Sequence, residues 1–485
     1  MKKSIYSFLF AALFCLTVSP VAAQYSKTSY FMESASYRHF MNPAQTPYRG
    51  YISFPIVSNY TMGFESNLGA SNFLFPSETS DELLTFMHPD VSADRFLDGL
   101  SDNNMFNMNL RTDLLGFGFY AGRSFVSFDV ALRTQGGVNM PKEFFAFLKK
   151  GMSNSQLTEY DIRNFTLSAN AFAEASLGFA TDVFDNIRVG ARVKFLAGIG
   201  GISAGIDQMD IRMTQDEWRV NTQATMAVYG GMLDIQENEE GYVDLQNITA
   251  STSEAGLGGK GIGLDFGVTY KPFKFLTVSA AVNDLGAIRW DQTAATFARS
   301  KGEVVFSGLN GLSTSSFGGS DDEDGEGGNA LSDQISDITD ELMELTQFQL
   351  VQDGDLSKTK LHTNIMLGLE ASTWKDRLSA GLLYTNTRAD YDNYSELMFI
   401  GNFRMIKQLQ LSASYALLSD YCRSCGVALT LLNTFYFSVE HLMMNYSPQF
   451  IPLDPISTSF QLGVNIPLNR KKTRTPRTSL GFFEL

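Results

Sequence analysis

Beyond its first 23 residues, the sequence lacks any apolar run long enough to cross a membrane as a helix. The best candidate, 195–206, is short and is interrupted by four glycines, whereas a membrane-spanning helix needs about 20 mostly apolar residues. Basic residues are also few, because 37 Lys and Arg stand against 52 Asp and Glu, giving a formal net charge of -15. This balance argues against nucleic acid and anionic lipid headgroups as partners.

Cysteine and histidine are scarce as well, with 3 and 4 residues respectively. Cys422 and Cys425 form a CRSC segment in a predicted outer loop, where a local disulfide is favoured over a zinc site that would need two further ligands. Covalent hydrolysis needs a nucleophile beside a histidine. The histidines stand in unrelated contexts, so we predict no enzyme activity; they are His39, His88, His362 and His441.

The first 23 residues read as an export signal. Lys2 and Lys3 precede an apolar run over 5–18, and Val21-Ala22-Ala23 has the small-residue pattern that a signal peptidase cuts, here before Gln24. The sequence therefore predicts a chain that leaves the cytoplasm through a cleaved signal peptide.

The strongest structural signal is a β-hairpin over 261–290. Its arms, 262–270 and 276–282, alternate apolar residues with small or polar ones around the turn at 271–274. Each arm is about as long as a tilted strand that crosses a bilayer. Because a soluble sandwich could contain the same hairpin, the surrounding sequence must decide between them.

Similar alternation recurs along the chain and predicts about 14 strands. Every tight turn falls on one side of the expected sheet and every long connection on the other, as in outer-membrane barrels. We therefore predict an all-β, transmembrane antiparallel barrel over 49–468 in the outer membrane of a Gram-negative cell. Long extracellular insertions are expected at 65–105, 134–162, 199–259 and 286–359, and a periplasmic tail at 469–485.

Several local features are also predicted. The alternation slips within 107–121, which indicates a bulge at Leu114, Leu115 and Gly116. Pro141 and Gly151 are placed as at the start and end of a helix. Other expected elements are short helices over 81–87 and 93–100, a small hairpin of 218–229 with 242–248, and an amphipathic helix over 329–346.

An acidic run over 318–329 precedes that last helix. Asp322, Asp324, Glu326 and Asp333 have part of the spacing of a calcium-binding loop, but Glu326 is atypical and Asp333 stands where a bidentate Glu is usual. A solvated acidic loop is the ordinary interpretation, and a Ca2+ site is the alternative. No other cofactor is predicted.

Three segments of the sequence resemble a known family. Asn42-Pro43-Ala44, the helix at 141–151, and GIGLDFGVTYKP followed by VNDLGAIRW are similar to outer-membrane barrels of the long-chain fatty-acid transporter superfamily, nearest its poorly characterised branches and those accompanying type IX secretion. The resemblance implies a 14-strand barrel plugged by residues 24–48, with Asn42, Pro43 and Ala44 in the plug. It also implies passage of hydrophobic ligands toward the membrane.

Two functions follow from these observations. The first is a transport channel for hydrophobic small molecules of fatty-acid type. The second is a non-transporting scaffold or secretion accessory whose outer loops hold another surface protein, because exposed loops on a rigid frame commonly carry recognition. Charged residues on the inward phase are expected to solvate the lumen or hold the plug, with a specific ligand site as the alternative; they are Arg111, Arg133, Arg188, Arg192, Lys194, Glu174, Asp265, Glu370 and Arg404.

Overall fold

The structure is a computed structural model of the chain. It describes residues 26–53, 59–77, 83–152, 157–214, 217–230, 233–234, 241–243, 249–250, 257–300, 302–307, 347–352, 358–373, 377–389, 393–406, 408–418, 422–442 and 457–470. The expected signal peptide, the amphipathic helix at 329–346, the acidic run and most of the predicted tail lie outside these residues.

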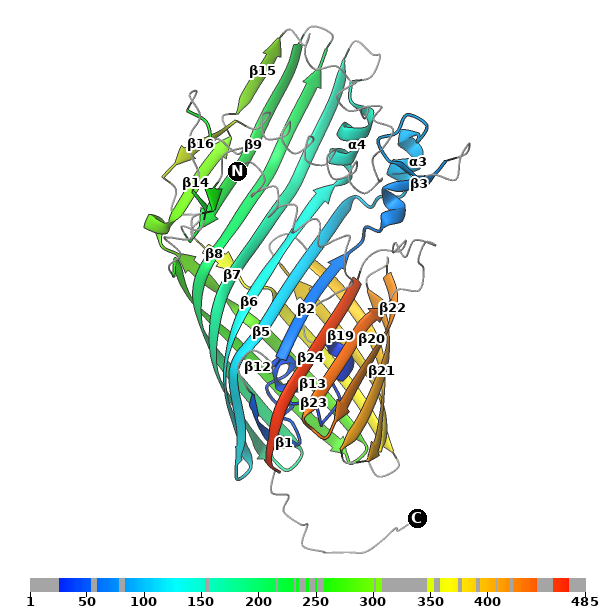
Figure 1. Cartoon of the computed structure of the whole chain (residues 1–485), viewed down its shortest axis with the longest axis vertical. Helices are drawn as coiled ribbons and strands as arrows, with labels where there is room; N and C mark the ends of the chain where they lie inside the picture. Colours follow the sequence, from blue (N-terminus) through cyan, green and yellow to red (C-terminus); the bar gives the residue numbers. More distant parts are fainter. Residues whose placement is uncertain are drawn as a thin grey trace, which may run out of the picture.

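The described strands close into a 14-strand antiparallel barrel, which confirms the predicted fold (Figure 1). One position is shared by β1 (Arg49–Ser53) and β2 (Asn59–Ser66), both of which pair with β24 and with β5, so the ring is complete. The other positions are β5 (Asn103–Ala121), β6 (Ser124–Pro141), β7 (Thr158–Phe184), β8 (Ile187–Met213), β12 (Gly259–Phe273), β13 (Leu276–Trp290), β18 (Thr363–Thr373), β19 (Leu378–Arg388), β20 (Asn393–Ile406), β21 (Leu409–Leu418), β22 (Cys422–Leu431), β23 (Phe435–Leu442) and β24 (Ser457–Arg470).

Side chains alternate between an apolar outer face and a polar lumen. On β7 and β8, Leu177, Phe179 and Phe195 are more than half exposed, while Glu174 and Lys194 are buried inside. Exposed apolar side chains on a closed ring suit contact with lipid tails, and the closed ring leaves no unpaired strand edge. None of the described helices has the length and apolar character to span a bilayer.

Tight turns gather at one end of the barrel, as the sequence predicts. The connections after β5, β7, β12 and β22 are short and lie at the lower end in Figure 1, where β24 also ends. In the last of these turns Leu432 and Asn433 have φ of 58° and 54°, the left-handed conformation that two-residue hairpin turns require. The long connections lie at the opposite end.

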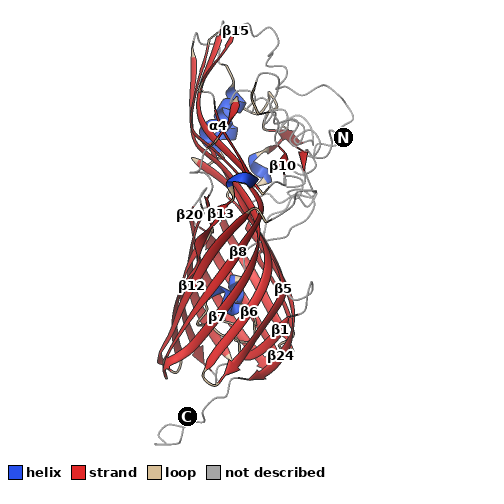
Figure 2. Cartoon of the chain, turned by 90° about the vertical axis from the view of Figure 1, so that its left-hand side faces the viewer, coloured by secondary structure: helices blue, strands red, loops and turns tan. Residues whose placement is uncertain are grey.

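At that opposite end the strands continue beyond the barrel (Figure 2). Strands β7 and β8 have 27 residues each, and the upper part of β8 pairs with β9 (Glu217–Tyr229). β9 also pairs with β14 (Ala295–Ser300) and β15 (Glu303–Ser307), and β14 pairs with β16 (Phe348–Val351). We call β9, β14, β15, β16 and the upper parts of β7 and β8 the sheet extension.

The sheet extension corrects the predicted loop insertions. Residues 134–162, 199–259 and 286–359 contain long pieces of β6, β7, β8 and β13 as well as the strands of the extension. The expected hairpin of 218–229 with 242–248 is wrong, because β9 pairs with β8, β14 and β15, whereas β10 (Leu233–Asp234) pairs with β11 (Thr249–Ala250). Residue alternation shows that a strand continues, but not where it leaves the membrane.

Two helices cover the inner face of the sheet extension. The predicted helix at 141–151 is confirmed as α4 (Lys142–Lys150), with Pro141 before it and Gly151 after it at φ 51°, and the helix expected over 93–100 is α3 (Ala93–Asp98). The helix expected over 81–87 is wrong, since β4 (Leu83–Thr85) pairs there with β3 (Leu74–Pro76). Between helices and sheet lies an apolar core that includes Phe96, Phe145, Ile162, Met209 and Ile211.

Candidate functional site in the barrel lumen

Residues 26–47, which we call the plug, lie inside the barrel. They contain the short helices η1 (Lys27–Ser29) and α2 (Arg38–Met41), and helix can be seen within the strands of the barrel in Figure 2. Most plug side chains are buried, including charged Lys27 and Arg38. The predicted internal plug is therefore confirmed.

The Asn42-Pro43-Ala44 motif packs directly on the barrel wall. Asn42 is fully buried, and its Oδ1 accepts a hydrogen bond from the Ala44 backbone N–H at 2.9 Å while its Nδ2 donates to the Ala280 carbonyl at 3.2 Å. Gly267 and Gly190, which are paired in the sheet, face the motif. A Cβ at Gly267 would overlap Asn42 Oδ1, and one at Gly190 would overlap the Pro43 backbone, so the close approach requires glycine.

Buried ion pairs hold the plug near its start. Lys27 Nζ lies 2.6 Å from Glu396 Oε2 and 3.7 Å from Glu65 Oε1, and all three side chains are nearly inaccessible to solvent. Burial alone would lower the pKa of Lys27, but the carboxylates of Glu396 and Glu65 outweigh it and raise that pKa above its ordinary value. Lys27 is therefore charged, and it partly neutralises two buried carboxylates.

Side chains of the wall also hold the end of the plug. Asn283 Nδ2 donates to the Met41 carbonyl at 2.6 Å, and Arg192 Nη2 donates to the His39 carbonyl at 2.8 Å. His39 Nε2 lies 2.9 Å from the Tyr51 hydroxyl. In the described part of the chain, no backbone–backbone hydrogen bond joins residues 26–47 to a barrel strand, so side chains make the polar attachment of the plug to the sheet.

A chain of ion pairs runs across the wall above the plug. Glu174 bridges Arg111 at 2.9 Å and Arg133 at 2.7 Å. Asp284 bridges Arg133 at 2.8 Å and Lys194 at 2.6 Å. The chain continues through Lys194–Asp265 at 2.7 Å to Asp265–Arg192 at 3.5 Å, and Arg111 also pairs with Asp113 at 2.7 Å. We call these residues the ionic network, in which four basic side chains balance four acidic ones.

Both ends of the ionic network meet the plug at one aromatic ring. The guanidinium carbons of Arg111 and Arg192 each lie 4.6 Å from the centre of the Phe40 ring, within the range of a cation–π contact. Phe40 is thus clamped between β5 and β8. The network therefore organises the wall and positions the end of the plug together.

Asp284 reaches the lumen through an irregularity in β13. Its φ is 60°, a left-handed value that Asn and Asp tolerate better than most residues. Its backbone N–H donates to Asp265 Oδ1 at 2.7 Å, and β12 slips its register against β13 at Asp265. As a result, Asn283 and Asp284 both line the lumen, although neighbours on a regular strand would face opposite sides.

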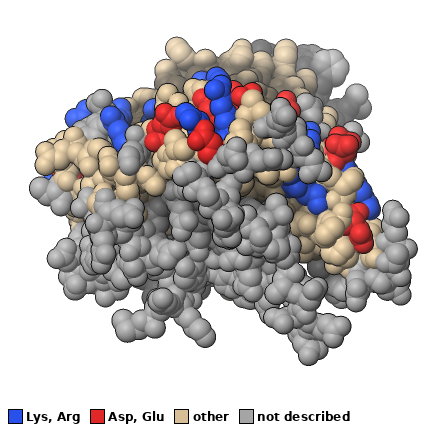
Figure 3. Space-filling view, turned by 90° about the horizontal axis from the view of Figure 1, so that it is seen from above, with Lys and Arg blue, Asp and Glu red and all other residues tan. Residues whose placement is uncertain are grey.

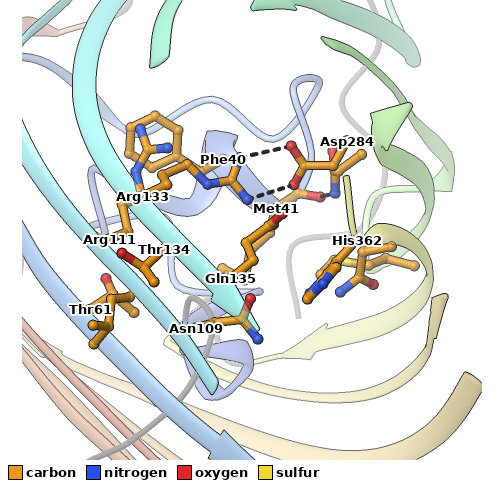
Figure 4. Close-up of a pocket in the computed structure, with 14 residues that line it drawn as sticks. Phe40, Met41, Thr61, Asn109, Arg111, Arg133, Thr134, Gln135, Asp284 and His362 are labelled. Carbon is orange, nitrogen blue, oxygen red and sulfur yellow. Dashed lines mark hydrogen bonds and ion pairs between the residues drawn. The ribbon is translucent and has the colours of Figure 1, made fainter. Parts of the chain in front are cut away.

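A small pocket lies between the plug and the ionic network (Figure 4). Its cavity volume is about 50 Å³, room for a head group or a few water molecules rather than an extended hydrocarbon chain. Its lining residues are mostly polar and are Phe40, Met41, Thr61, Asn109, Leu110, Arg111, Arg133, Thr134, Gln135, Asn283, Asp284, His362, Asn364 and Met366. We call this space the lumen pocket.

An apolar cluster continues the lumen above the ionic network. It contains Phe172 of β7, Leu196 of β8 and Trp290 of β13, and it also includes Leu361, the neighbour of the pocket residue His362. The Phe172 ring lies 5.3 Å from the Arg133 guanidinium carbon, so the cluster borders the lumen pocket directly. Above the ionic network, apolar side chains therefore fill the lumen toward the sheet extension.

The structure brings together several of the predicted residues. Asn42, Pro43 and Ala44 contact the strand that carries GIGLDFGVTYKP, and Asn283 from VNDLGAIRW holds Met41. A register shift between Asp113 and Leu115 lies where the sequence predicts a bulge at Leu114, Leu115 and Gly116. By contrast, the 141–151 helix lies in the sheet extension, away from the plug.

Other predicted sites have different outcomes. The predicted disulfide is wrong: Cys425 is a free thiol, and CRSC lies in β22 rather than in a loop. Residues three apart on a strand are separated by about 10 Å, too far for a disulfide. The calcium-loop residues Asp322, Asp324, Glu326 and Asp333 lie outside the described residues, among which no group of three or more His, Cys, Asp or Glu could hold a metal ion.

Sequence reasoning missed several acidic residues of the lumen. Glu65, Glu396 and Glu440 surround the start of the plug, and Asp284 links two basic residues. The three glutamates lie on strands in which apolar and polar residues alternate, and this alternation could have placed them on the lumen side. Asp284 could not be found in this way, because alternation fails at its left-handed backbone.

Comparison with family models finds a match over residues 43–439 to a family of unknown function, DUF5723. The chain belongs to this family. The match begins within the Asn-Pro-Ala motif and covers most of the barrel. No curated protein matches the sequence.

Solved structures similar to the chain include hydrocarbon channels and transporters. A TodX deltaS2S3 mutant monoaromatic hydrocarbon channel has a TM-score of 0.41 at 9% identity, with 93% of this chain and 96% of that chain covered. The Ralstonia pickettii toluene transporter TbuX has a TM-score of 0.36 at 10% identity, covering 89% and 92%. A Pseudomonas aeruginosa FadL homologue has a TM-score of 0.33 at 11% identity, covering 88% and 90%.

Proposed function

We propose that this protein is an outer-membrane channel for small hydrophobic molecules, described here with its plug in the closed position. The observation that carries the proposal is the attachment of the plug. Side chains bind it to the wall, while the strands pair only with one another, so it can move without breaking the ladder of backbone hydrogen bonds. The lumen of a 14-strand barrel is wide enough to hold such a plug.

The hydrophobic class of cargo is supported by the upper lumen. Aromatic and aliphatic side chains, including Phe172, Leu196 and Trp290, lie where a molecule arriving from the sheet extension would first enter the barrel. Seen from above, the described outer surface carries basic and acidic side chains side by side (Figure 3).

Uptake into vesicles tests this proposal. Vesicles that contain the purified barrel should take up a fluorescent hydrophobic probe faster than protein-free vesicles, which measure spontaneous entry. A matched Asn42→Ala variant removes the hydrogen bonds to Ala44 and Ala280 and should change the uptake rate if the motif gates passage. Uptake no faster than in protein-free vesicles, for both proteins, would contradict a channel.

A surface scaffold is the second candidate, and the lower lumen favours it. Asn42 is fully buried, and the lumen pocket beside the plug is small and lined mostly by polar residues, which favours a filled lumen over an open apolar tunnel at the motif. The sheet extension also has its own apolar core and could present a rigid surface to another protein. Inert vesicles, together with co-purification of a second surface protein that is lost when the sheet extension is altered, would support this role.

A further inference from the structure

We propose that the lumen pocket binds the head group of an amphiphile, and that this head group is a neutral hydroxyl rather than a carboxylate. The inference rests on the proposed channel function and specifies the class of its cargo. It predicts that monoacylglycerols or related alcohols are bound in preference to free fatty acids.

Two hydrogen-bond acceptors in the lumen pocket carry the proposal. Gln135 is 1% exposed and Asn283 is 4% exposed, and the amide oxygens Gln135 Oε1 and Asn283 Oδ1 have no hydrogen-bond partner among the described residues. Asn283 Nδ2 donates to the Met41 carbonyl, which leaves its Oδ1 as the acceptor. Because buried acceptors favour partners strongly, the pocket suits a ligand that donates hydrogen bonds.

The charged residues of the pocket disfavour an anionic head group. Arg133 is paired with both Glu174 and Asp284, and Arg111 with Asp113 and Glu174. A ligand carboxylate would lie near the carboxylates of Glu174 and Asp284, which already pair with Arg133. An ammonium group would instead lie close to the two guanidinium groups. A neutral hydroxyl avoids both repulsions, and it can donate to an amide oxygen.

The surroundings of the pocket suit the rest of such a molecule. Its small volume accommodates a head group, and the apolar cluster with Phe172 and Leu361 borders it on the side of the sheet extension. A ligand with its head group at Gln135 would extend its hydrocarbon chain toward this cluster. The arrangement therefore matches an amphiphile in size, polarity and direction.

Binding of monolaurin, lauric acid and dodecane to the purified full chain tests the inference. The natural sequence should bind monolaurin about tenfold more tightly than laurate, which is the effect of roughly one net hydrogen bond at the upper end of its range. Gln135→Leu should remove this preference without changing dodecane binding. Gln135→Met, which keeps an unbranched side chain, should give the same result if the leucine variant folds poorly.

Asn107→Leu is the matched control. Asn107 is 2% exposed, its Oδ1 also has no partner in the described region, and it does not line the lumen pocket. This variant should therefore retain the preference for monolaurin. Laurate bound as tightly as monolaurin, or the same loss in Gln135→Leu and Asn107→Leu, would overturn the inference.

Parallel vesicle uptake separates this inference from the channel proposal. Passage of dodecane and laurate without selective binding of monolaurin would support the channel and overturn the head-group assignment. Selective, Gln135-dependent binding of monolaurin without passage of any probe would support the pocket and overturn the channel. Neither binding nor passage of any of the three would overturn both.

Discussion

Strands β7 and β8 pass through two regions whose faces have opposite character. In the barrel their outer face is apolar, with Leu177 and Phe195 more than half exposed, and their inner face carries Glu174 and Lys194. In the sheet extension the inner face carries apolar side chains such as Ile162, Met209 and Ile211. The outer face there is charged, and its residues form exposed ion pairs, including Arg212–Glu159 and Arg163–Asp161.

The inversion follows from what surrounds each region. Around the barrel, lipid tails contact the outer face and the plug occupies the lumen; around the extension, water contacts the outer face and α3 and α4 cover the inner one. β8 contains an additional residue where its register against β7 shifts between Ala171 and Phe172. This residue moves the following side chains of β8 to the opposite face, so its apolar residues point inward in the sheet extension. The two interiors therefore differ in composition: buried charge pairs accompany apolar clusters in the lower one, whereas the core of the upper one is apolar.

Among substitutions that test this difference between the two interiors, Lys27→Met in the lower one should cause the largest loss of stability. Removing Lys27 leaves Glu396 and Glu65 buried without their cation, a change that typically costs about 3–5 kcal/mol. Hydrogen exchange of backbone amides in the plug should then become roughly a hundredfold to several thousandfold faster. The amides of the sheet extension should not change.

Arg404→Gln is the control for this experiment. The Arg404–Glu33 pair also joins plug and wall, at 2.9 Å, but its side chains are 28% and 44% exposed. Exposed pairs contribute about 0–1 kcal/mol, so plug exchange should change little. If both variants release the plug equally, burial of the charge does not determine how the plug is held.

The corresponding change in the upper interior is Ile211→Ala. Ile211 is completely buried in the core beneath α3 and α4, and such truncations cost about 2–5 kcal/mol. Exchange should accelerate in α4, β9 and the upper parts of β7 and β8, whereas the plug should remain protected. Equal acceleration in the plug would show that the two interiors form one cooperative unit.

The fold could be predicted from the sequence because each barrel strand has one apolar and one small or polar face. The helix at 141–151 was also predictable, because Pro141 and Gly151 act through local backbone preferences. The sheet extension was not. Its strands keep the same alternation with the faces exchanged, and a pattern of period two does not say which solvent each face meets.

The candidate site was predictable only in part. Asn42, Pro43 and Ala44 and many lumen charges were identified, but their partners depend on pairings between strands far apart in the sequence, such as Lys27 with Glu396. The lumen pocket depends on Asp284, whose left-handed backbone interrupts the strand. The predicted disulfide failed because CRSC was assigned to a loop and the strand β22 extends through it.

Substitutions on the outer faces should cause a smaller loss of stability, and Leu177→Arg tests this expectation in the barrel. Leu177 is 52% exposed on the apolar outer surface of the barrel, where an arginine near the middle of the bilayer costs about 2–4 kcal/mol. Chemical unfolding in lipid vesicles should show the corresponding loss of stability. Little or no loss would mean that this surface does not face hydrocarbon.

The smallest effect is expected on the same face of the same two strands, in the sheet extension. Arg212→Leu introduces an apolar side chain at a position that is 66% exposed, and it removes the ion pair with Glu159, itself 55% exposed. Surface substitutions of this kind usually change the free energy of unfolding by less than about 0.5 kcal/mol, and pairs so exposed contribute little. The same unfolding measurement should therefore give nearly the natural stability. A loss as large as that of Leu177→Arg would place the extension in contact with something other than water, and the two regions would then differ in their interiors alone.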